Sequence, residues 1–197
     1  MLSSLRFMPE SPSEYNVNKT KLAKQDHEGN MIKRMMRAAR LDAAVYEEVE
    51  ADSSATVQAM AVVVLVALAT GIGAFGKGGL VGLVVGIPAS IGLWAVWAWI
   101  TYLVGTTILK STETEANWGQ LARTLGFAQS PGVLKVVGFI PGIGPLFFVI
   151  ASIWQLVTMV IAIRQALDFT STWRAVGVAL VGFIPYALVT SLIYAFI

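Results

Sequence analysis

The sequence predicts an all-α integral membrane protein in which five transmembrane helices, the third of them short, follow a polar N-terminal region. Hydrophobic residues make up 56% of the 197 residues and charged residues only 13%, whereas a soluble domain carries about 25% charged residues. Residues 1–56 hold 8 of the 14 Lys and Arg and 9 of the 12 Asp and Glu. The remainder is so apolar that its natural surroundings are a lipid bilayer.

Residues 1–30 are predicted to form a polar N-terminal arm. This stretch is rich in Ser, Pro, Asn, Lys and Glu and shows no periodic pattern of apolar residues. We therefore expect it to be disordered on its own and to become ordered on binding another subunit. The residues expected at such a partner contact are Leu5, Phe7 and Tyr15.

Residues 31–56 are predicted to form an amphipathic cytoplasmic helix followed by a linker. At 100° per residue, apolar residues between Ile32 and Tyr46 share one face of this helix. Arg34, Arg37 and Arg40 lie off that face, and a basic amphipathic helix is typical of an anionic membrane surface. We expect these arginines to contact lipid head groups. The alternative is a soluble helix packed on a partner.

Residues 57–197 are predicted to form the membrane domain, with five apolar stretches as its helices. Four of them have 18 to 25 residues, enough to cross about 30 Å of hydrocarbon. The third has ten residues, which give only about 15 Å of α-helix, and we expect an interfacial helix, Asn117–Gln129, to lead into it. The five stretches are Val57–Phe75, Leu80–Val104, Pro131–Ile140, Leu146–Ile163 and Ala175–Phe196.

The distribution of Lys and Arg indicates whether the short third stretch crosses the membrane. With five crossings, the N-terminal region, residues 105–130 and residues 164–174 share one side, and that side holds 12 of the 14 Lys and Arg. Basic segments are retained on the cytoplasmic side. The sequence therefore predicts five crossings, with the N-terminus in the cytoplasm and the C-terminus outside.

Two copies of the pentapeptide VGFIP, ending at Pro141 and at Pro185, predict breaks in the helices. After the first copy, two glycines lie between two prolines, a pattern that indicates a tight turn. The second copy lies in the last apolar stretch, where a proline kinks a helix without ending it. The predicted breaks are Pro141, Gly142, Gly144, Pro145 and Pro185.

One side of the second predicted helix carries almost no side chains. Gly78, Gly82, Gly86 and Ser90 recur every four residues, and such a stripe lets another helix approach closely. Four aromatic residues, Trp94, Trp97, Trp99 and Tyr102, follow in the same helix. We interpret them as an aromatic belt at the membrane interface. The alternative is a pigment- or lipid-binding surface.

The sequence predicts no catalytic, metal-binding or cofactor-binding residues. It contains no cysteine, and its single histidine, His27, lies in the polar arm, so the membrane domain has no thiolate or imidazole ligand. No paired carboxylates, no nucleophile with its base and no phosphate-binding glycine loop are found. The formal net charge of +2 is too small to indicate nucleic acid binding. We therefore do not expect an enzyme.

A few polar residues lie within or beside the apolar stretches. We expect Lys135 to extend to the membrane interface, and Gln155 and Thr158 to form hydrogen bonds between helices. Arg164 and Asp168 are four residues apart and are expected to form a surface pair.

The chain contains, in this order, the segments MIKRMMRAARLDAAVYEEVEADSSATVQA, NWGQLARTLGFAQSPGVL, GFIPGIGPL and VIAIRQALDFTSTWRA. Together they resemble the bacterial branch of the YIP (Ypt-interacting-protein) domain family over residues 31–197. The resemblance implies a five-helix domain with a cytoplasmic N-terminus in the bacterial inner (plasma) membrane. Eukaryotic members are linked to Rab-type GTPases, but their Asp-Leu-Tyr-Gly-Pro motif does not occur here, so no site residue is carried over.

These observations predict a non-catalytic membrane scaffold or accessory subunit of a larger assembly. Its expected partners are the membrane, other integral membrane protein subunits and anionic lipid head groups, and no cofactor is expected. The alternative is a transporter or lipid-handling protein that uses the broken third and fifth helices, because transporters bind substrates at interrupted helices.

Overall fold

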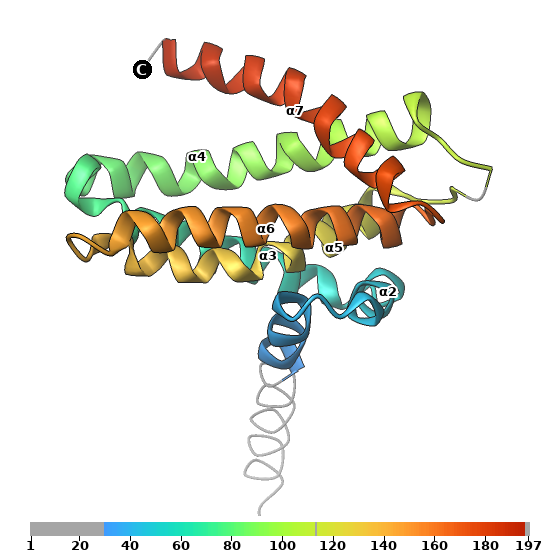
Figure 1. Ribbon diagram of the computed structural model, residues 1–197, viewed down its shortest axis with the longest axis horizontal. Coiled ribbons are helices and arrows are strands. Elements are labelled where there is room, and N and C mark those ends of the chain that lie inside the picture. The colour runs from blue at the N-terminus through green and yellow to red at the C-terminus, as the bar shows by residue number, and fades with distance from the viewer. Residues whose placement is uncertain (1–29, 113, 196–197) are drawn as a thin grey trace, which may run out of the picture. The chain divides into compact units, whose positions relative to one another are not determined.

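The computed structural model describes residues 30–112 and 114–195, and it gives side-chain positions for these residues except 76–78, 81–82, 189–190 and 192–195. All regular structure in the described part of the chain is helical (Figure 1), which confirms the predicted all-α class. The predicted partner contacts in the arm, Leu5, Phe7 and Tyr15, lie outside the described residues.

Within the described residues, three helices are long and apolar enough to cross a membrane. They are α3 (Ala55–Gly73), residues Leu83–Ile108 and α6 (Gly144–Ala166). Leu83–Ile108 combines most of α4 (Phe75–Leu103), which has a kink at Gly79, with the π-helical turn Val104–Ile108. The three helices confirm the first, second and fourth predicted stretches. The last predicted stretch corresponds to α7 (Thr172–Ala195), which has a shorter apolar part in the described residues. Five crossings stay a prediction.

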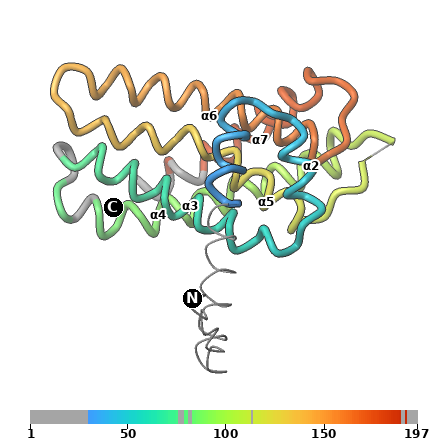
Figure 2. Tube along the Cα trace, turned by 90° about the horizontal axis from the view of Figure 1, so that it is seen from below, coloured from blue at the N-terminus to red at the C-terminus, as the bar shows by residue number. Residues whose placement is uncertain are grey.

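A composite rod takes the place of the predicted interfacial helix and short third span. It consists of α5 (Trp118–Ala128) and, after Gln129, the 3₁₀-helix η2 (Ser130–Phe139). A 3₁₀-helix rises about 2.0 Å per residue, so η2 covers about 20 Å instead of the 15 Å of an α-helix, and the whole rod is about 36 Å long. Figure 2 shows the rod running alongside α6. The predicted helix at Asn117–Gln129 is confirmed as α5, which packs on α3 and α6, and its position at the membrane interface stays a prediction.

Contacts between distant segments define the two ends of the bundle. At one end, the backbone of Gly73 lies against Gly138, so the end of α3 meets the end of η2. At the other end, the Thr114 hydroxyl donates to the Leu167 carbonyl, 3.0 Å away, so the segment after α4 meets the end of α6. Successive rods therefore run in alternating directions.

The predicted break at residues 141–145 occurs where the sequence places it, whereas a kink at Pro185 stays a prediction. The chain turns at residues 141–143 between η2 and α6, and Gly142 has a φ of 86°, a left-handed conformation that favours glycine. Gly144 and Pro145 then begin α6, where a proline is tolerated because the first helical N–H groups have no partner in the helix. Pro185 lies inside α7, and the helix continues past it.

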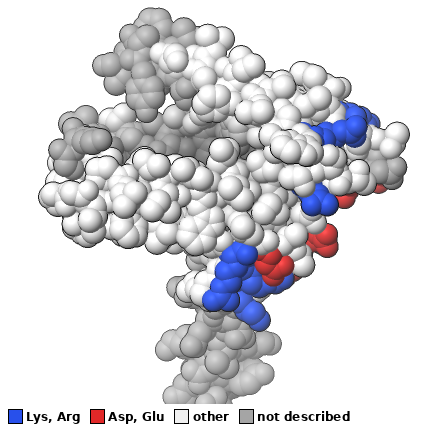
Figure 3. Space-filling model, in the orientation of Figure 1, with Lys and Arg blue, Asp and Glu red and all other residues white. Residues whose placement is uncertain are grey.

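Residues 34–52, which include α2 (Ala43–Ala51), form a segment that we call the polar cap. Asp42 begins α2 by accepting a hydrogen bond from the Ala44 N–H at 3.1 Å. The apolar side of α2, with Tyr46 and Val49, is buried, and α2 packs on α5 and α6. In the view of Figure 3, charged side chains gather over the cap and one end of the bundle. The predicted single helix is divided at residues 40–42, and its predicted apolar face is divided as well: Tyr46 is buried, whereas Met36 and Ala43 are exposed.

Candidate functional site

A cavity of about 420 Å³ lies between the central parts of α3, α4, α6 and α7, with residues of the composite rod in its wall. Gln155 marks its position along the bundle, because it is the middle residue of α6. The lining is mostly apolar with a small number of polar groups, which is typical of a ligand pocket. The polar lining includes Ser90, Trp94, Trp97, Gln129, Lys135 and Gln155.

The 3₁₀ geometry of η2 brings Lys135 to this cavity. Residues three apart lie on the same side of a 3₁₀-helix, so Gly132, Lys135 and Gly138 share one side. A Cβ on Gly132 would lie 2.6 Å from Val66 on α3 and 3.2 Å from the Gln155 amide on α6. The glycines therefore let η2 approach both helices closely, and the Lys135 side chain leaves η2 between them.

Hydrogen bonds join three polar side chains in the cavity wall. Lys135 Nζ donates to Gln155 Oε1 at 2.7 Å, and Gln155 Nε2 donates to Gln129 Oε1. The ammonium group also lies 5.3 Å from the ring centroid of Phe148, close enough for a cation–π attraction. The expected interhelical role of Gln155 is confirmed. The expectation that Lys135 extends to the interface is wrong, because Gln155 provides an acceptor halfway along α6.

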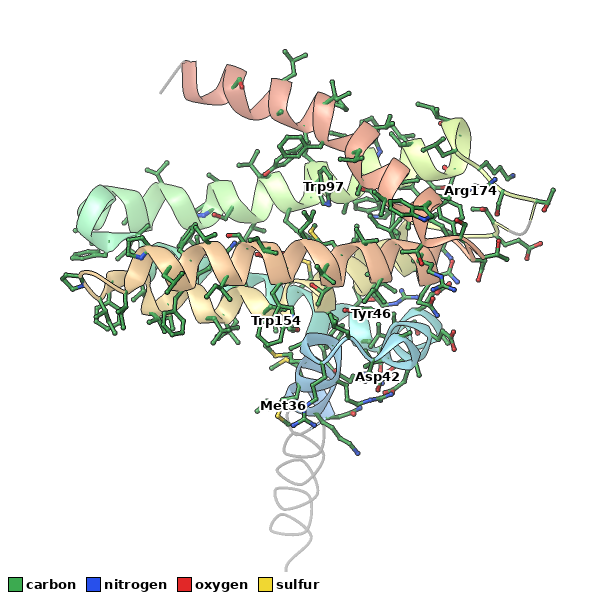
Figure 4. All side chains as sticks on the ribbon, in the orientation of Figure 1. Met36, Asp42, Tyr46, Trp97, Trp154 and Arg174 are labelled. Carbon is green, nitrogen blue, oxygen red and sulfur yellow. The ribbon has the colours of Figure 1, made fainter. Side chains whose placement is uncertain are left out.

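Two tryptophan side chains line the cavity from α4. Trp94 and Trp97 are 9% and 6% exposed, and neither indole Nε1–H has a hydrogen-bond partner among the described residues. Trp97 meets Tyr186 of α7 edge to face, with ring centroids 5.3 Å apart (Figure 4). A buried donor without a partner costs about 1–3 kcal/mol. The predicted interfacial belt is wrong for these two residues, which lie in the cavity wall, whereas Trp99 is exposed.

The cavity wall contains a basic side chain and no acidic one. Its lining contains no Asp or Glu, and in the described part of the chain the ion pairs involve only arginines and carboxylates of the polar cap. Lys135 therefore has a hydrogen bond and an aromatic ring but no carboxylate as neighbour. Among these residues no three His, Cys, Asp or Glu side chains gather to hold a metal ion. The cavity offers a cation and hydrogen-bond donors to an acceptor-bearing ligand.

The arginines that the sequence assigns to lipid contact lie in the polar cap, and two of them form ion pairs there. Arg34 is 5% exposed and donates to Glu48 and Asp52, each at 2.8 Å, and to Gln58 of α3 at 3.0 Å. Arg37 donates to Glu48 at 2.5 Å. These bonds hold the two helices of the cap together and tie them to α3. The structure thus gives Arg34 an internal role that the sequence did not predict.

Further hydrogen bonds fasten the cap to the bundle. Arg123 of α5 donates to the Val49 carbonyl at 3.0 Å, and Trp154 of α6 donates to the Ala39 carbonyl at 2.8 Å. Figure 4 shows Trp154 on the side of α6 that faces the cap. Arg40 is the exposed one of the three arginines. Contact between these arginines and lipid stays a prediction.

The pKa values of two carboxylates in the cap region are shifted in opposite directions. Hydrogen bonds from Ser54 and Arg34 lower the pKa of Asp52 to about 2. Burial raises the pKa of Glu50 to about 7, and the charge of Asp168 contributes to the same shift. Glu50 therefore changes its charge near neutral pH, at the contact between α2 and the end of α6.

The predicted packing stripe on α4 is not where the closest described contacts occur. No atom lies within 4 Å of the position that a Cβ on Gly86 would take, so the prediction of close packing is wrong at this residue. Ser90 lines the cavity and donates to the Gly86 carbonyl at 2.7 Å. The surroundings of Gly78 and Gly82 lie outside the described side chains. The close contacts are at Gly71, Gly73, Gly105, Gly126, Gly132, Gly138 and Gly144.

Two further polar predictions have different outcomes. Thr158 donates to the Ala128 carbonyl at 2.7 Å, which confirms an interhelical hydrogen bond between α6 and α5. Arg164 and Asp168 do not form the expected pair. The chain leaves α6 before Asp168, which has a φ of 51°, and Arg164 donates to the Phe169 carbonyl at 3.2 Å instead.

Sequence reasoning missed Gln129 and the inward position of two tryptophans. The sequence pattern placed Gln129 at the end of an interfacial helix, and nothing in that pattern indicated that its side chain lines the cavity. Trp94 and Trp97 lie 11 and 14 residues after Leu83, near the middle of the 26-residue apolar helix Leu83–Ile108. Counting residues along that helix would have placed both indoles away from the interface.

In a comparison with protein families, residues 42–192 match the Yip1 domain. No curated protein and no solved structure matches the chain. The matched segment covers 151 of the 197 residues and includes every residue that lines the cavity.

Proposed function

Because the chain belongs to the Yip1 domain family, a generally non-catalytic family of membrane proteins, we propose that it is a scaffold or accessory subunit of a larger assembly in the bacterial inner membrane. Its partners are other integral membrane protein subunits, and anionic lipid head groups contribute to the contact. The arm, with Leu5, Phe7 and Tyr15, binds a partner subunit in this proposal.

The observation that carries the proposal is the construction of the polar cap. Arg34 and Arg37 are used in ion pairs within the chain, so the cap is held in one arrangement on the bundle. On this fixed support Met36 and Leu41 are exposed, at 51% and 41%, beside charged side chains. Large apolar side chains with a polar rim are typical of a protein–protein contact.

Substitution of the two exposed residues tests this contact. Met36→Gln keeps a good helix former, and Leu41→Asn suits the left-handed φ of 64° at this position. We expect the double variant to retain its fold and to lose co-purifying membrane proteins after mild detergent extraction and native electrophoresis. Trp173→Ser, which alters an 83% exposed residue outside the cap, is the matched control.

Deleting residues 2–28 tests the arm in the same assay. If wild-type protein migrates without a partner, or if both the cap variant and the deletion retain the same partners in equal amounts, the scaffold proposal is wrong.

Five membrane crossings, with a cytoplasmic N-terminus and an external C-terminus, belong to the same proposal. The alternating rods support this topology, since the turn at residues 141–143 lies at the end of α3 and the segment 167–171 lies at the opposite end. The composite rod, about 36 Å long, is sufficient for a bilayer.

The absence of cysteine from the sequence permits a direct test with single cysteines and a membrane-impermeant thiol reagent. Five crossings predict that Ser111→Cys and Ser171→Cys react only from the cytoplasmic side and that Ile143→Cys reacts only from outside. If Ile143→Cys and Ser111→Cys react from the same side, the composite rod does not cross.

One observation favours a second candidate, a transporter or lipid-handling protein: a mostly apolar cavity with a few polar groups lies halfway along the bundle. Pro185 lies inside α7 next to the cavity residues Phe183 and Tyr186; in this candidate it marks a helix interruption of the kind at which transporters bind substrates. Vesicles containing the protein and fluorescent lipids test transfer between leaflets. Pro185→Ala and Gln155→Leu should slow that transfer, and an absence of transfer by wild type contradicts this candidate.

A further inference from the structure

The Lys135 ammonium lies in surroundings where a charge is costly. It comes from η2 and reaches Gln155, the middle residue of α6, and the other helices also face the cavity with their central residues. A charged side chain at such a depth in a membrane protein is rare and faces a partner or a polar cavity. In the described residues an amide oxygen and the Phe148 ring are its neighbours, and neither carries a negative charge.

Two indole N–H groups add to the same site. Trp94 and Trp97 are each more than nine-tenths buried, both line the cavity, and both donors are without an acceptor among the described residues. Unsatisfied buried polar groups are uncommon in folded proteins and need a physical explanation. A ligand that carries several acceptor oxygens would satisfy both donors.

The remaining lining indicates what is attached to these oxygens. Most of it is aliphatic or aromatic, and two of the lining residues, Leu156 of α6 and Phe183 of α7, are 54% and 57% exposed. The cavity therefore continues onto the outer surface of the bundle between these two helices. In a membrane that surface faces acyl chains. At about 420 Å³, the cavity is in the size range that encloses a small ligand.

We propose that the cavity binds an anionic amphiphile, with a phosphate or carboxylate head group at Lys135, Trp94 and Trp97. Its acyl chain leaves the cavity past Leu156 and Phe183. The negative head group neutralises Lys135 and accepts hydrogen bonds from the two indoles, so one ligand accounts for all three groups. The site does not require a partner protein and is compatible with a scaffold or a lipid-handling role.

Native mass spectrometry of the full chain in detergent tests the proposal with four probes. Dioleoyl phosphatidylglycerol and oleate carry anionic heads on acyl chains, dioleoyl phosphatidylcholine has the same chains with a head of no net charge, and inorganic phosphate has no chain. We expect saturable binding of one molecule of phosphatidylglycerol or oleate. Whichever of the two binds more tightly identifies the head group. Phosphatidylcholine should bind at least about tenfold more weakly.

Three substitutions locate the binding. Lys135→Gln should weaken it at least about tenfold, whereas Lys110→Gln, which removes an exposed lysine in a loop, should leave it unchanged. Trp97→Phe retains an aromatic ring and removes the donor, and should weaken binding about fivefold. Thermal unfolding in the same detergent checks that each variant is folded.

Several results would overturn the proposal. They are no saturable binding, equal affinity for phosphatidylcholine, equal losses in Lys110→Gln and Lys135→Gln, or binding of inorganic phosphate as tight as that of the lipids. If Lys135→Gln does not fold, the preference of wild type for anionic over neutral lipid decides. Partner co-purification is a separate measurement, so the scaffold proposal and this one can fail independently.

Discussion

The docking of the polar cap on the bundle predicts that Glu50→Gln stabilises the protein at high pH and has no effect at low pH. Glu50 lies near the end of α2, where burial raises its pKa from an ordinary value of 4.5 to about 7. The neighbouring charges of Asp168 and Glu47 raise it as well, and Arg123 lowers it. The folded state therefore favours the protonated carboxyl group.

The sign follows from the raised pKa in the folded state. The protonated form contributes stability that is fully present below pH 4.5 and is lost as the pH rises through about 7. Glutamine has no charge to acquire, so the variant escapes this loss. The shift corresponds to roughly 3 kcal/mol without solvent screening, and we expect about 1–2 kcal/mol because water reaches part of the side chain.

Thermal unfolding in detergent between pH 4.5 and 8.5 measures the effect as the difference in Tm between variant and wild type. For a chain of this size, 1 kcal/mol corresponds to about 2–4 °C. We expect no difference at pH 4.5 and a Tm about 3–6 °C higher for Glu50→Gln at pH 8.5. Groups that titrate equally in both proteins cancel in the difference.

Glu48→Gln provides an internal control of opposite sign. Burial raises the pKa of Glu48, but hydrogen bonds from Arg34 and Arg37 outweigh burial and hold it below its ordinary value. This substitution should lower the Tm at neutral pH, and the loss should vanish under acid conditions. A constant difference between Glu50→Gln and wild type over the whole pH range would refute the placement of Glu50 against the bundle.

Three further predictions concern packing and hydrogen bonds, each measured as Tm in detergent. Gly73→Ala should cost about 1–3 kcal/mol because its Cβ would overlap backbone of η2, whereas Gly86→Ala should be neutral; equal effects would contradict the packing described. Arg34→Met should cost about 1–3 kcal/mol, since it removes three hydrogen bonds, two of them to the part-exposed carboxylates of Glu48 and Asp52, and Arg40→Met should cost little; equal losses in the two variants would show that the ion pairs do not hold the cap. Thr158→Val should cost about 1 kcal/mol by removing a hydrogen bond between α6 and α5, and an unchanged Tm would contradict that bond.

The long helices could be predicted because a bilayer leaves few choices. Backbone groups in hydrocarbon must be satisfied within the segment, so an apolar stretch of about 20 residues is read as a helix. The turn between η2 and α6 could be predicted from the sequence as well, because Pro and Gly act through local backbone geometry. Gly142 lies in the turn and Pro185 inside α7, as predicted.

Residues that act across the chain could not be predicted in this way. Arg34 pairs with Glu48 and Asp52, 14 and 18 residues away, and the pairing depends on the turn at Leu41, where a positive φ at a non-glycine residue gives no sequence signal. The glycine stripe on α4 has the expected spacing, but spacing alone does not say which side of a helix has a neighbour. At Gly86 that side is open.

The position of Lys135 depends on the least regular part of the chain. In an α-helix, residues three and six positions apart are offset by about 60° and 120° around the axis, so Gly132, Lys135 and Gly138 would cover a third of the circumference. In the 3₁₀-helix they fall on one side, where the glycines contact α3 and Lys135 reaches Gln155. Close packing of η2 and delivery of a cation to the cavity therefore have one geometric cause.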